Sequence, residues 1–348
     1  MKSSYVSSQA VTQALRYSMS RMQSELVSAQ KEVATLRVAD PGLTLGARSG
    51  FSVSLARDVA RLEVLKDSNA LVASRLTSTQ NSLSLLSSRA EELRSTLTAA
   101  VSGSSGPLVA QQDASAMMET LNSIMNTSIN GEYLFAGTNT DVLPLADFSD
   151  PASPARVDFD QSFLTTFGFT ADDPAAAGIT PAQMENFMTN VVEPQFFGSG
   201  WANWSSATDD SIVSRIALNE TAQTSVSANI SGVRKLAMAA AMSSAMLGRS
   251  LNTGTTASIV TRSLGLVAEG VAEIADQKSK TGLVENRVTN ASARITMQSD
   301  LFESTIQDME GVDPYAASTR VSALITQIET SYSLTARIQG LSLLRFLG

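Results

Sequence analysis

Apolar residues recur at alternating steps of three and four positions near both ends of the chain. Near the start, the stripe contains Val11, Leu15, Met22, Leu26 and Val33. Near the end, it contains Ile325, Ile328, Tyr332, Ile338, Leu341 and Leu344. This spacing lines one face of an α-helix and favours supercoiling against a partner. Because a lone amphipathic helix cannot bury its stripe, we predict that the two end segments pair, and that neighbouring molecules cover what remains.

The same helical spacing continues inward from both ends. It predicts a first helix that ends near Arg37, where Asp40-Pro41-Gly42 breaks the chain. It then predicts long helices over Phe51–Val101 and Thr256–Met309, each far above the usual globular length. Shorter helices are expected around Met117 and over Gly232–Arg249, while Asp313 should cap the last helix and Gly340 should fray it. Asn69 and Thr79 fall close to the stripe of the Phe51–Val101 helix and are interpreted as register-setting or tolerated polar residues.

The middle of the chain has a different character. From Thr138 to Ser214 there are eleven acidic residues and one basic residue, together with both tryptophans. We predict a separate, partly β domain here. Its expected strands are Val157–Phe163 and Ser211–Leu218, with a short helix over Pro181–Val192 and a hairpin turn at Asn219-Glu220 that leads to Thr224–Ala228.

These patterns together predict a mainly α fold. Both ends of the chain should form a long antiparallel coiled-coil or helical-bundle rod, with a small central α+β domain inserted. The expected division is an N-terminal assembly helix over 1–40 that is disordered in the monomer, rod halves over 41–137 and 229–311, a central acidic domain over 138–228, and a C-terminal assembly helix over 312–348.

Composition excludes several kinds of site. The chain has no cysteine and no histidine, which removes disulfides, thiolate chemistry, histidine triads and the commonest metal ligand. A net charge of −8 argues against a nucleic-acid surface. No apolar run is long enough to span a bilayer. The acidic centre could hold a carboxylate pair or a calcium site, but no spacing supports either. We therefore expect no enzyme activity, no cofactor and no metal.

Several local strings resemble the flagellin superfamily, the exported subunits that build the bacterial flagellum. In the tail these are Val312-Asp313-Pro314-Tyr315, Ser331-Tyr332-Ser333-Leu334-Thr335-Ala336-Arg337 and the closing Leu341–Leu347. Gly131-Glu132-Tyr133-Leu134-Phe135-Ala136-Gly137-Thr138 is similar to the hook–filament junction branch of that superfamily. The resemblance covers roughly residues 3–140 and 233–348. Arg37-Val38-Ala39-Asp40-Pro41-Gly42-Leu43 departs from the polar stretch usual in filament flagellins.

The resemblance implies a structural subunit that is secreted and extracellular, and that joins hook to filament as a tip-assembled ring. It implies five kinds of partner: neighbouring copies, a hook-associated protein on the hook side, flagellin on the filament side, the export apparatus and an export chaperone. It implies no nucleic acid and no membrane span. The eleven stripe residues at the two ends are the expected assembly interface.

Three other hypotheses stay open at this point. The first is a short or minor filament flagellin, which would be distributed along the filament. The second is a soluble coiled-coil adaptor, which would need a membrane or signalling element. The third is a carbohydrate-acting enzyme that uses acidic residues such as Asp158 or Asp172.

Overall fold

The computed structural model describes residues 8–347, with the backbone alone for residues 8, 9, 12 and 338–347. The chain forms two compact units. The terminal unit combines the chain up to Val64 with the chain from Ile295 onward, and the central unit spans Leu65–Arg294. Segments from both ends of the sequence therefore fold together, as the paired stripes predict.

The terminal unit is helical in its described residues. It contains α1 (Ser8–Thr35), α2 (Pro41–Leu45), the 3-10 turn η1 (Gly46–Arg48), the start of α3 (Ser49–Val101), the end of α9 (Thr253–Glu310) and α10 (Pro314–Leu347). The carboxylate of Asp40 caps α2 by accepting from the Leu43 amide at 3.0 Å, and Asp313 caps α10 by accepting from the Tyr315 amide at 2.8 Å. Each aspartate precedes a proline, which needs no amide partner in a first turn.

The central unit contains most of the short elements. These are α4 (Pro107–Met125), β1 (Ser128–Ile129), β2 (Glu132–Tyr133), α5 (Pro154–Phe167), η2 (Pro174–Gly178), α6 (Pro181–Phe187), the π-turn η3 (Met188–Val192), α7 (Glu193–Phe197), η4 (Ser199–Asn203), β3 (Val213–Ala217), β4 (Glu220–Gln223) and α8 (Ser231–Met246). The strands form two short antiparallel hairpins, β1–β2 and β3–β4.

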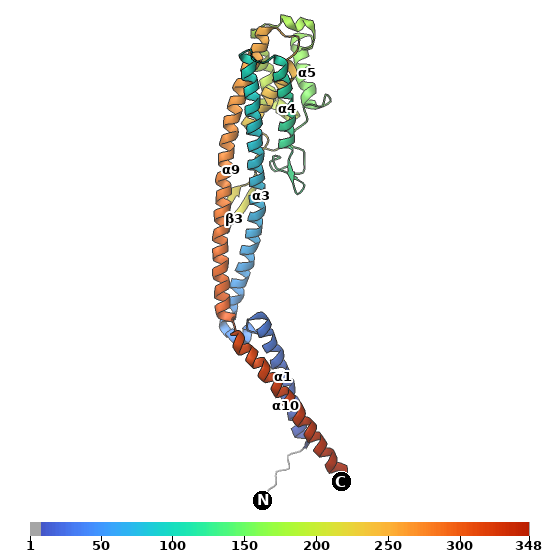
Figure 1. The fold of residues 1–348 in the computed structure, drawn as a ribbon, viewed down its shortest axis with the longest axis vertical. Helices are drawn as coiled ribbons and strands as arrows, with labels where there is room; N and C mark the ends of the chain where they lie inside the picture. Colours follow the sequence, from blue (N-terminus) through green and yellow to red (C-terminus); the bar gives the residue numbers. More distant parts are fainter. Residues whose placement is uncertain (1–7, 348) are drawn as a thin grey trace. The chain divides into compact units, whose positions relative to one another are not determined.

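Within the central unit, α3 and α9 lie side by side and antiparallel (Figure 1). Thr77 on α3 donates to Glu285 on α9 at 2.7 Å, and Gln80 donates to the Lys278 carbonyl at 2.8 Å. Partner numbers fall on α9 as they rise on α3, which is the antiparallel order. The buried leucines of α3 from Leu76 to Leu97 follow the predicted stripe.

Helix α8 is buried on every side. All its residues from Gly232 to Met246 are buried except Arg234 and Lys235, which are half-buried. Alanines, serines and methionines make this possible, because small side chains let α4, α7 and α9 approach closely and methionine fills the irregular gaps. The largest hydrophobic core runs through α8 and joins α3, α4 and α9 to the aromatic residues of the acidic segment, including Phe148, Phe159 and Trp204.

The acidic segment leaves and re-enters the helical part at neighbouring points. The Ala228 amide donates to the Phe135 carbonyl at 2.7 Å, and Ala136 pairs with Ser227 in an isolated antiparallel bridge. Just before this exit, Asn130 and Gly131 both have positive φ and form the turn of the β1–β2 hairpin. The acidic segment is therefore inserted between two points of the helical part that are far apart in sequence but neighbours in space.

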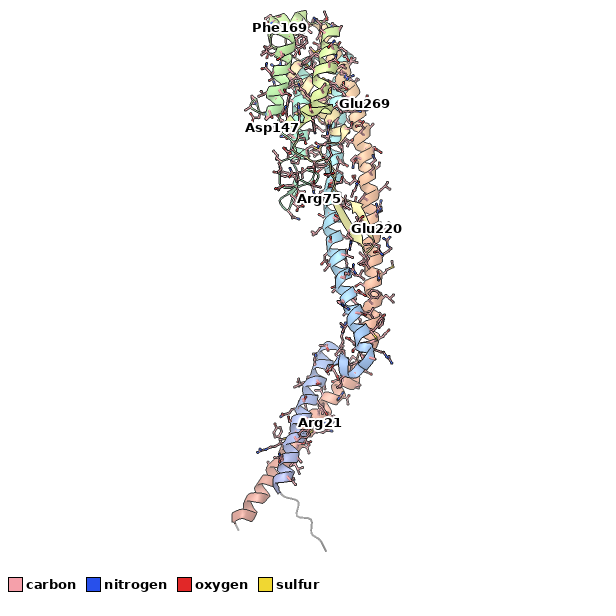
Figure 2. The ribbon with its side chains drawn as sticks, turned by 180° about the vertical axis from the view of Figure 1, so that it is seen from behind. Arg21, Arg75, Asp147, Phe169, Glu220 and Glu269 are labelled. Carbon is pink, nitrogen blue, oxygen red and sulfur yellow. The ribbon has the colours of Figure 1, made fainter. Side chains whose placement is uncertain are left out.

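The β3–β4 hairpin packs on α3 and α9. The buried Asn69 side chain donates to the Ile216 carbonyl at 2.8 Å and to Ser292 at 3.2 Å. Glu220 lies at the turn of this hairpin (Figure 2). It accepts from Arg287 at 3.1 Å and from Arg294 at 2.8 Å. Ile216 is fully buried between these contacts. Asn69 is thus a structural residue that holds the hairpin on the helix pair.

The predicted fold class is confirmed: the chain is mainly α, with long helices from both ends and a small central region that contains short antiparallel sheets. The helices predicted over Phe51–Val101, Thr256–Met309 and Pro181–Val192 are also confirmed to within a few residues. The hairpin turn at Asn219-Glu220 is present, although its second strand is Glu220–Gln223 and not Thr224–Ala228. The five-part division of the chain stays a prediction.

Two predictions are wrong. Val157–Phe163 is not a strand but part of α5, because Ala155, Phe159 and Phe163 are buried at steps of four and Gly168 ends the helix at φ 84°. The alternating Val-Asp-Phe-Asp run inside that helix imitates a strand. Gly340 does not interrupt the last helix, since the backbone of α10 remains helical to Leu347. The sequence also predicts that Ser3 or Ser4 caps the first helix, and both residues lie outside the described part of the chain.

A substitution at Gly137 tests the close backbone packing at the start of the inserted segment. Its φ is +69°, and a Cβ there would collide with the Thr208 carbonyl and lie 2.8 Å from the Asp210 carbonyl. Gly137→Ala should lower the free energy of unfolding by about 2 kcal/mol or more, from left-handed strain plus the collision. Gly178→Ala is the control, because a Cβ at Gly178 meets no atom within 4 Å. Urea unfolding measures both, and equal stability of the two variants would contradict this geometry.

Candidate functional site

Helices α1 and α10 pair in the terminal unit and run antiparallel (Figure 1). Gln23 donates to the Tyr332 hydroxyl at 3.0 Å, and Glu32 lies 3.8 Å from Arg320 in an ion pair. The predicted pairing of the two chain ends is therefore confirmed. These polar contacts are exposed and contribute little, so the pair depends on the apolar residues between the helices.

Only three apolar residues of the described pair are buried. They are Ala29 on α1 and Ala317 and Leu324 on α10. No described residue of the terminal unit belongs to either hydrophobic core cluster, since both clusters lie between Leu76 and Ala291, within the central unit. Two helices can cover one face of each other but leave the flanks of each stripe open. The α1–α10 pair thus has an incomplete core of its own.

The predicted interface residues occupy this incompletely covered surface. Val11, Leu15, Met22, Leu26 and Ile328 are half-buried. Val33, Ile325 and Tyr332 are more exposed, at 37%, 40% and 51%. The side chains of Ile338, Leu341 and Leu344 lie outside the described residues, although their backbone belongs to α10. Their role in assembly stays a prediction.

Sequence periodicity missed a second set of apolar residues. Leu43 is 87% exposed and Tyr315 85%, while Tyr17 and Val27 on α1 are exposed at 76% and 66%. These positions lie off the three-and-four stripe, so the search for a seam passed over them. Their signal is a large apolar residue at a position that the helical pattern assigns to solvent. A single chain offers them no cover, which makes them candidate contacts for neighbours.

The connections that leave α1 and α9 lie side by side and are hydrogen-bonded. The Val38 amide donates to the Glu310 carbonyl at 2.8 Å, and the Val312 amide donates to the Leu36 carbonyl at 3.1 Å. Leu36 has a φ of 52°, which is strained for a branched side chain. Nearby, the buried Glu310 carboxylate accepts from Ser52 and lies 3.7 Å from Arg37. These contacts fix where the terminal pair begins.

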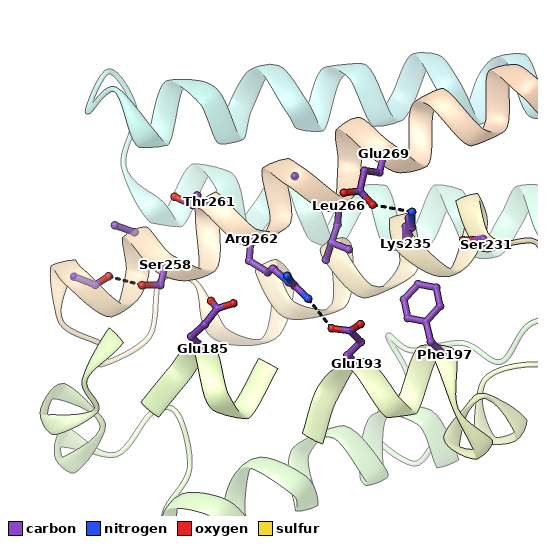
Figure 3. Close-up of a pocket in the computed structure, with 13 residues that line it drawn as sticks. Glu185, Glu193, Phe197, Ser231, Lys235, Ser258, Thr261, Arg262, Leu266 and Glu269 are labelled. Carbon is purple, nitrogen blue, oxygen red and sulfur yellow. Dashed lines mark hydrogen bonds and ion pairs between the residues drawn. The ribbon is translucent and has the colours of Figure 1, made fainter. Parts of the chain in front are cut away.

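A groove in the central unit lies between α9, the start of α8 and the α6–α7 segment (Figure 3). Its volume is about 950 Å³. Arg262 pairs with Glu193 at 2.6 Å, and Lys235 contacts both Glu269 and Glu273 at 2.7 Å. Glu185, Phe197 and small residues of α9 complete its walls. No sequence motif marked this groove, because its residues come from four separate helices.

Burial and ion pairing shift the pKa values of Lys235 and Glu273 in opposite directions. Hydrogen bonds to Glu269 and Glu273 raise the pKa of Lys235, although burial alone would lower it. Burial alone would raise the pKa of Glu273, but hydrogen bonds from Lys235 and Ser231 outweigh it and the pKa is lowered. Both shifts mean that the charged forms stabilise the folded state.

Two acidic residues considered above as catalytic candidates contact other side chains in the structure. Asp172 pairs with Arg249 at 2.9 Å, and Asp158 accepts weakly from Asn203 at 3.4 Å. Within residues 8–347, no cluster of three or more His, Cys, Asp and Glu side chains could bind a metal ion. Among the described helices, none is long and apolar enough to cross a membrane.

Lys235→Met should destabilise the protein near neutral pH, with a loss that shrinks in acid. The Glu273 contribution is present above its ordinary pKa of 4.5 and disappears as pH falls through its lowered folded value. The Lys235 contribution is present below 10.5 and disappears only as pH rises through its raised folded value. Urea unfolding at neutral pH and below 4.5 measures the difference.

Lys280→Met is the control for that measurement. Lys280 pairs with Asp276 on the same helix, and both side chains are 64% exposed. An exposed pair of this kind contributes little at any pH. A loss for Lys235→Met that equals the control at neutral pH, or that stays constant into acid, would contradict the assigned ion pairs.

Comparisons with known proteins identify the helical ends of the chain. Residues 6–140 match the family described as the bacterial flagellin N-terminal helical region, and residues 264–347 match the bacterial flagellin C-terminal helical region. No curated protein is significantly similar to the chain in sequence.

A solved structure supports the same fold. It is a candidate flagellar hook-associated protein from Vibrio parahaemolyticus, with 13% sequence identity and a TM-score of 0.52. The alignment covers 76% of this chain and 97% of that one. At this identity the likeness concerns the fold alone. The two flagellin regions, in order and at opposite ends of a chain whose ends pair, show that this protein is a member of the flagellin superfamily and a structural component of the bacterial flagellum.

Proposed function

We propose that this chain is the subunit that joins the flagellar hook to the filament, assembled as a ring of copies at the growing tip. The incompletely buried α1–α10 pair carries this proposal. Its apolar residues would be covered by the same residues of neighbouring copies, and each side chain so buried would contribute about 1.5–3 kcal/mol. Such a surface has no use in an isolated molecule and suits a polymer subunit.

Two observations favour the junction over the filament itself. Residues 131–138 resemble the junction branch and stand where the inserted segment begins. The solved neighbour is a candidate hook-associated protein that aligns over nearly its whole length. On this proposal the partners are copies of the chain, a hook-associated protein on one side and flagellin on the other. Export by the flagellar apparatus with a chaperone, and an extracellular final location, belong to the same proposal.

Eleven stripe positions remain the proposed assembly interface, and we add the exposed Tyr17, Val27, Leu43 and Tyr315. These four contribute little to the stability of the single chain, because they are mostly exposed. Substituting them should therefore separate assembly from folding, which substituting the seam residues cannot do.

Tyr17→Asp and Val27→Asp should reduce the number of flagella per cell several-fold while leaving the unfolding of the purified subunit unchanged. A charge at either position would be buried unpaired between copies, which is costly. Gln30→Asp, on an exposed polar position of α1, is the matched control. Flagella are counted by electron microscopy in cells that carry only the variant. Normal flagella with Tyr17→Asp and Val27→Asp combined would argue against α1 as an assembly surface.

The position of the subunit tests the junction directly. Antibody labelling of isolated flagella should give one band at the distal end of the hook. Label spread along the filament would instead indicate a minor filament flagellin. Absence of label from flagella that contain hook and filament would contradict both.

A further inference from the structure

We propose that the groove beside α9 binds the outer face of the first part of α3 from a neighbouring copy. This inference rests on the proposed function, since it takes assembly of copies for granted and names one contact within it. The groove and the α3 face lie on different parts of the chain. Their contact would join unlike surfaces, which is the kind of interface that builds rings and open helical arrays.

The α9 wall of the groove contains a run of small residues. Gly254, Ala257, Ser258, Thr261 and Gly265 line it, with the larger side chains of Arg262, Leu266 and Glu269 beside them. A Cβ at Gly265 would meet no atom within 4 Å, whereas one at Gly270 would meet Leu236 at 2.9 Å. Gly270 is therefore explained by packing within the chain, and Gly265 is not.

The open space beside Gly265, which Gly270 lacks, leaves room for the backbone of a helix from another molecule. A glycine inside a helix costs about 1 kcal/mol relative to alanine. Nothing within the described chain uses the space above Gly265. A helix from another molecule could use it, because small residues allow two helix axes to approach closely.

The charges that line the groove favour a cationic occupant. Its carboxylates are Glu185, Glu193 and Glu269, against the two cations Lys235 and Arg262. Both cations are already paired, Arg262 with Glu193 and Lys235 with Glu269 and Glu273. Glu185 is exposed and makes no ion pair with any described residue. A docking surface should therefore bring a basic residue close to Glu185.

The outer face of α3 in the terminal unit has the complementary pattern. Opposite the buried Leu55 and Leu62, that face presents Val53 and Val64, exposed at 60% and 69%, with Ala60 between them. Arg57 and Arg61 lie on this face, are exposed and make no ion pair with any described residue, while the exposed acids Asp58 and Glu63 lie at its edges. A carboxylate placed over Arg57 would add a contact of complementary charge.

In the proposed contact, Val53 to Val64 lies along Gly254 to Gly265, and each stretch covers eleven helical steps, or about 17 Å. Valine and alanine methyl groups would lie over the small residues of α9. Arg57 would then face Glu185, the groove carboxylate that has no ion pair among the described residues.

Cysteine cross-linking tests this contact, because the natural chain has no cysteine. A double variant, Ala60→Cys with Gly265→Cys, should form reducible covalent oligomers in isolated flagella under mild oxidation. Each single variant should stay monomeric on the same non-reducing gel. Ser95→Cys with Gly265→Cys is the control, since Ser95 is exposed on a later part of α3. Monomers alone from the double variant, at normal amounts in flagella, would overturn the proposal.

Charge exchange provides the second measurement if the cysteine variants fail to assemble. Glu185→Arg and Arg57→Glu should each lower the number of filaments several-fold, and the two together should restore it at least in part. A combined variant no better than the singles would overturn the contact. If the wild-type subunit is found at the hook end but neither cross-linking nor rescue is seen, only this inference is contradicted. If the wild-type subunit is missing from flagella, the proposed function itself is contradicted.

Discussion

Two paired helices bury only the facing seam of their apolar stripes, and this constraint governs the terminal unit. Each helix covers one face of its partner, and the flanks of both stripes stay open. In the described α1–α10 pair, the buried apolar residues are Ala29, Ala317 and Leu324 alone. The central unit buries more apolar surface because further elements pack on its two long helices. Helices α4 and α8 and the inserted segment cover α3 and α9, and one core runs through all of them.

The central and terminal units therefore differ in the source of their stability. In the central unit, burial within one chain suffices, and polar contacts such as Asn69 with Ile216 or Glu220 with Arg287 fasten the smaller parts. In the terminal unit, capping aspartates and the hydrogen bonds between the two linkers fix where the helices begin. The remaining apolar surface is left for other copies under the proposed function. A subunit built in this way can fold before it assembles and is completed by assembly.

Much of the helical architecture could be predicted from sequence, because the stripe of each long helix repeats many times. The pairing of the chain ends followed from two stripes that each lacked a partner. Residues 157–163 misled the prediction, since a short alternating run fits either period until its burial is known. In the structure, Phe159 and Phe163 are buried one turn apart.

The candidate surfaces were harder to predict than the fold. The seam residues could be found by spacing, but exposed residues such as Leu43 and Tyr315 become informative only when their exposure is known. The groove needed coordinates, since its walls come from helices far apart in the sequence. Gly265 reads as an ordinary helical glycine until the empty space beside it is seen.

The claim on which this account depends is that the α1–α10 pair is completed by neighbours. Hydrogen–deuterium exchange of the dilute subunit and of the same subunit within isolated flagella tests it directly. The account predicts fast exchange over 8–35 and 314–347 in the free subunit, slow exchange over α8 in both samples, and strong protection of the two end segments only after assembly. End segments as protected in the free subunit as in the flagellum would contradict it.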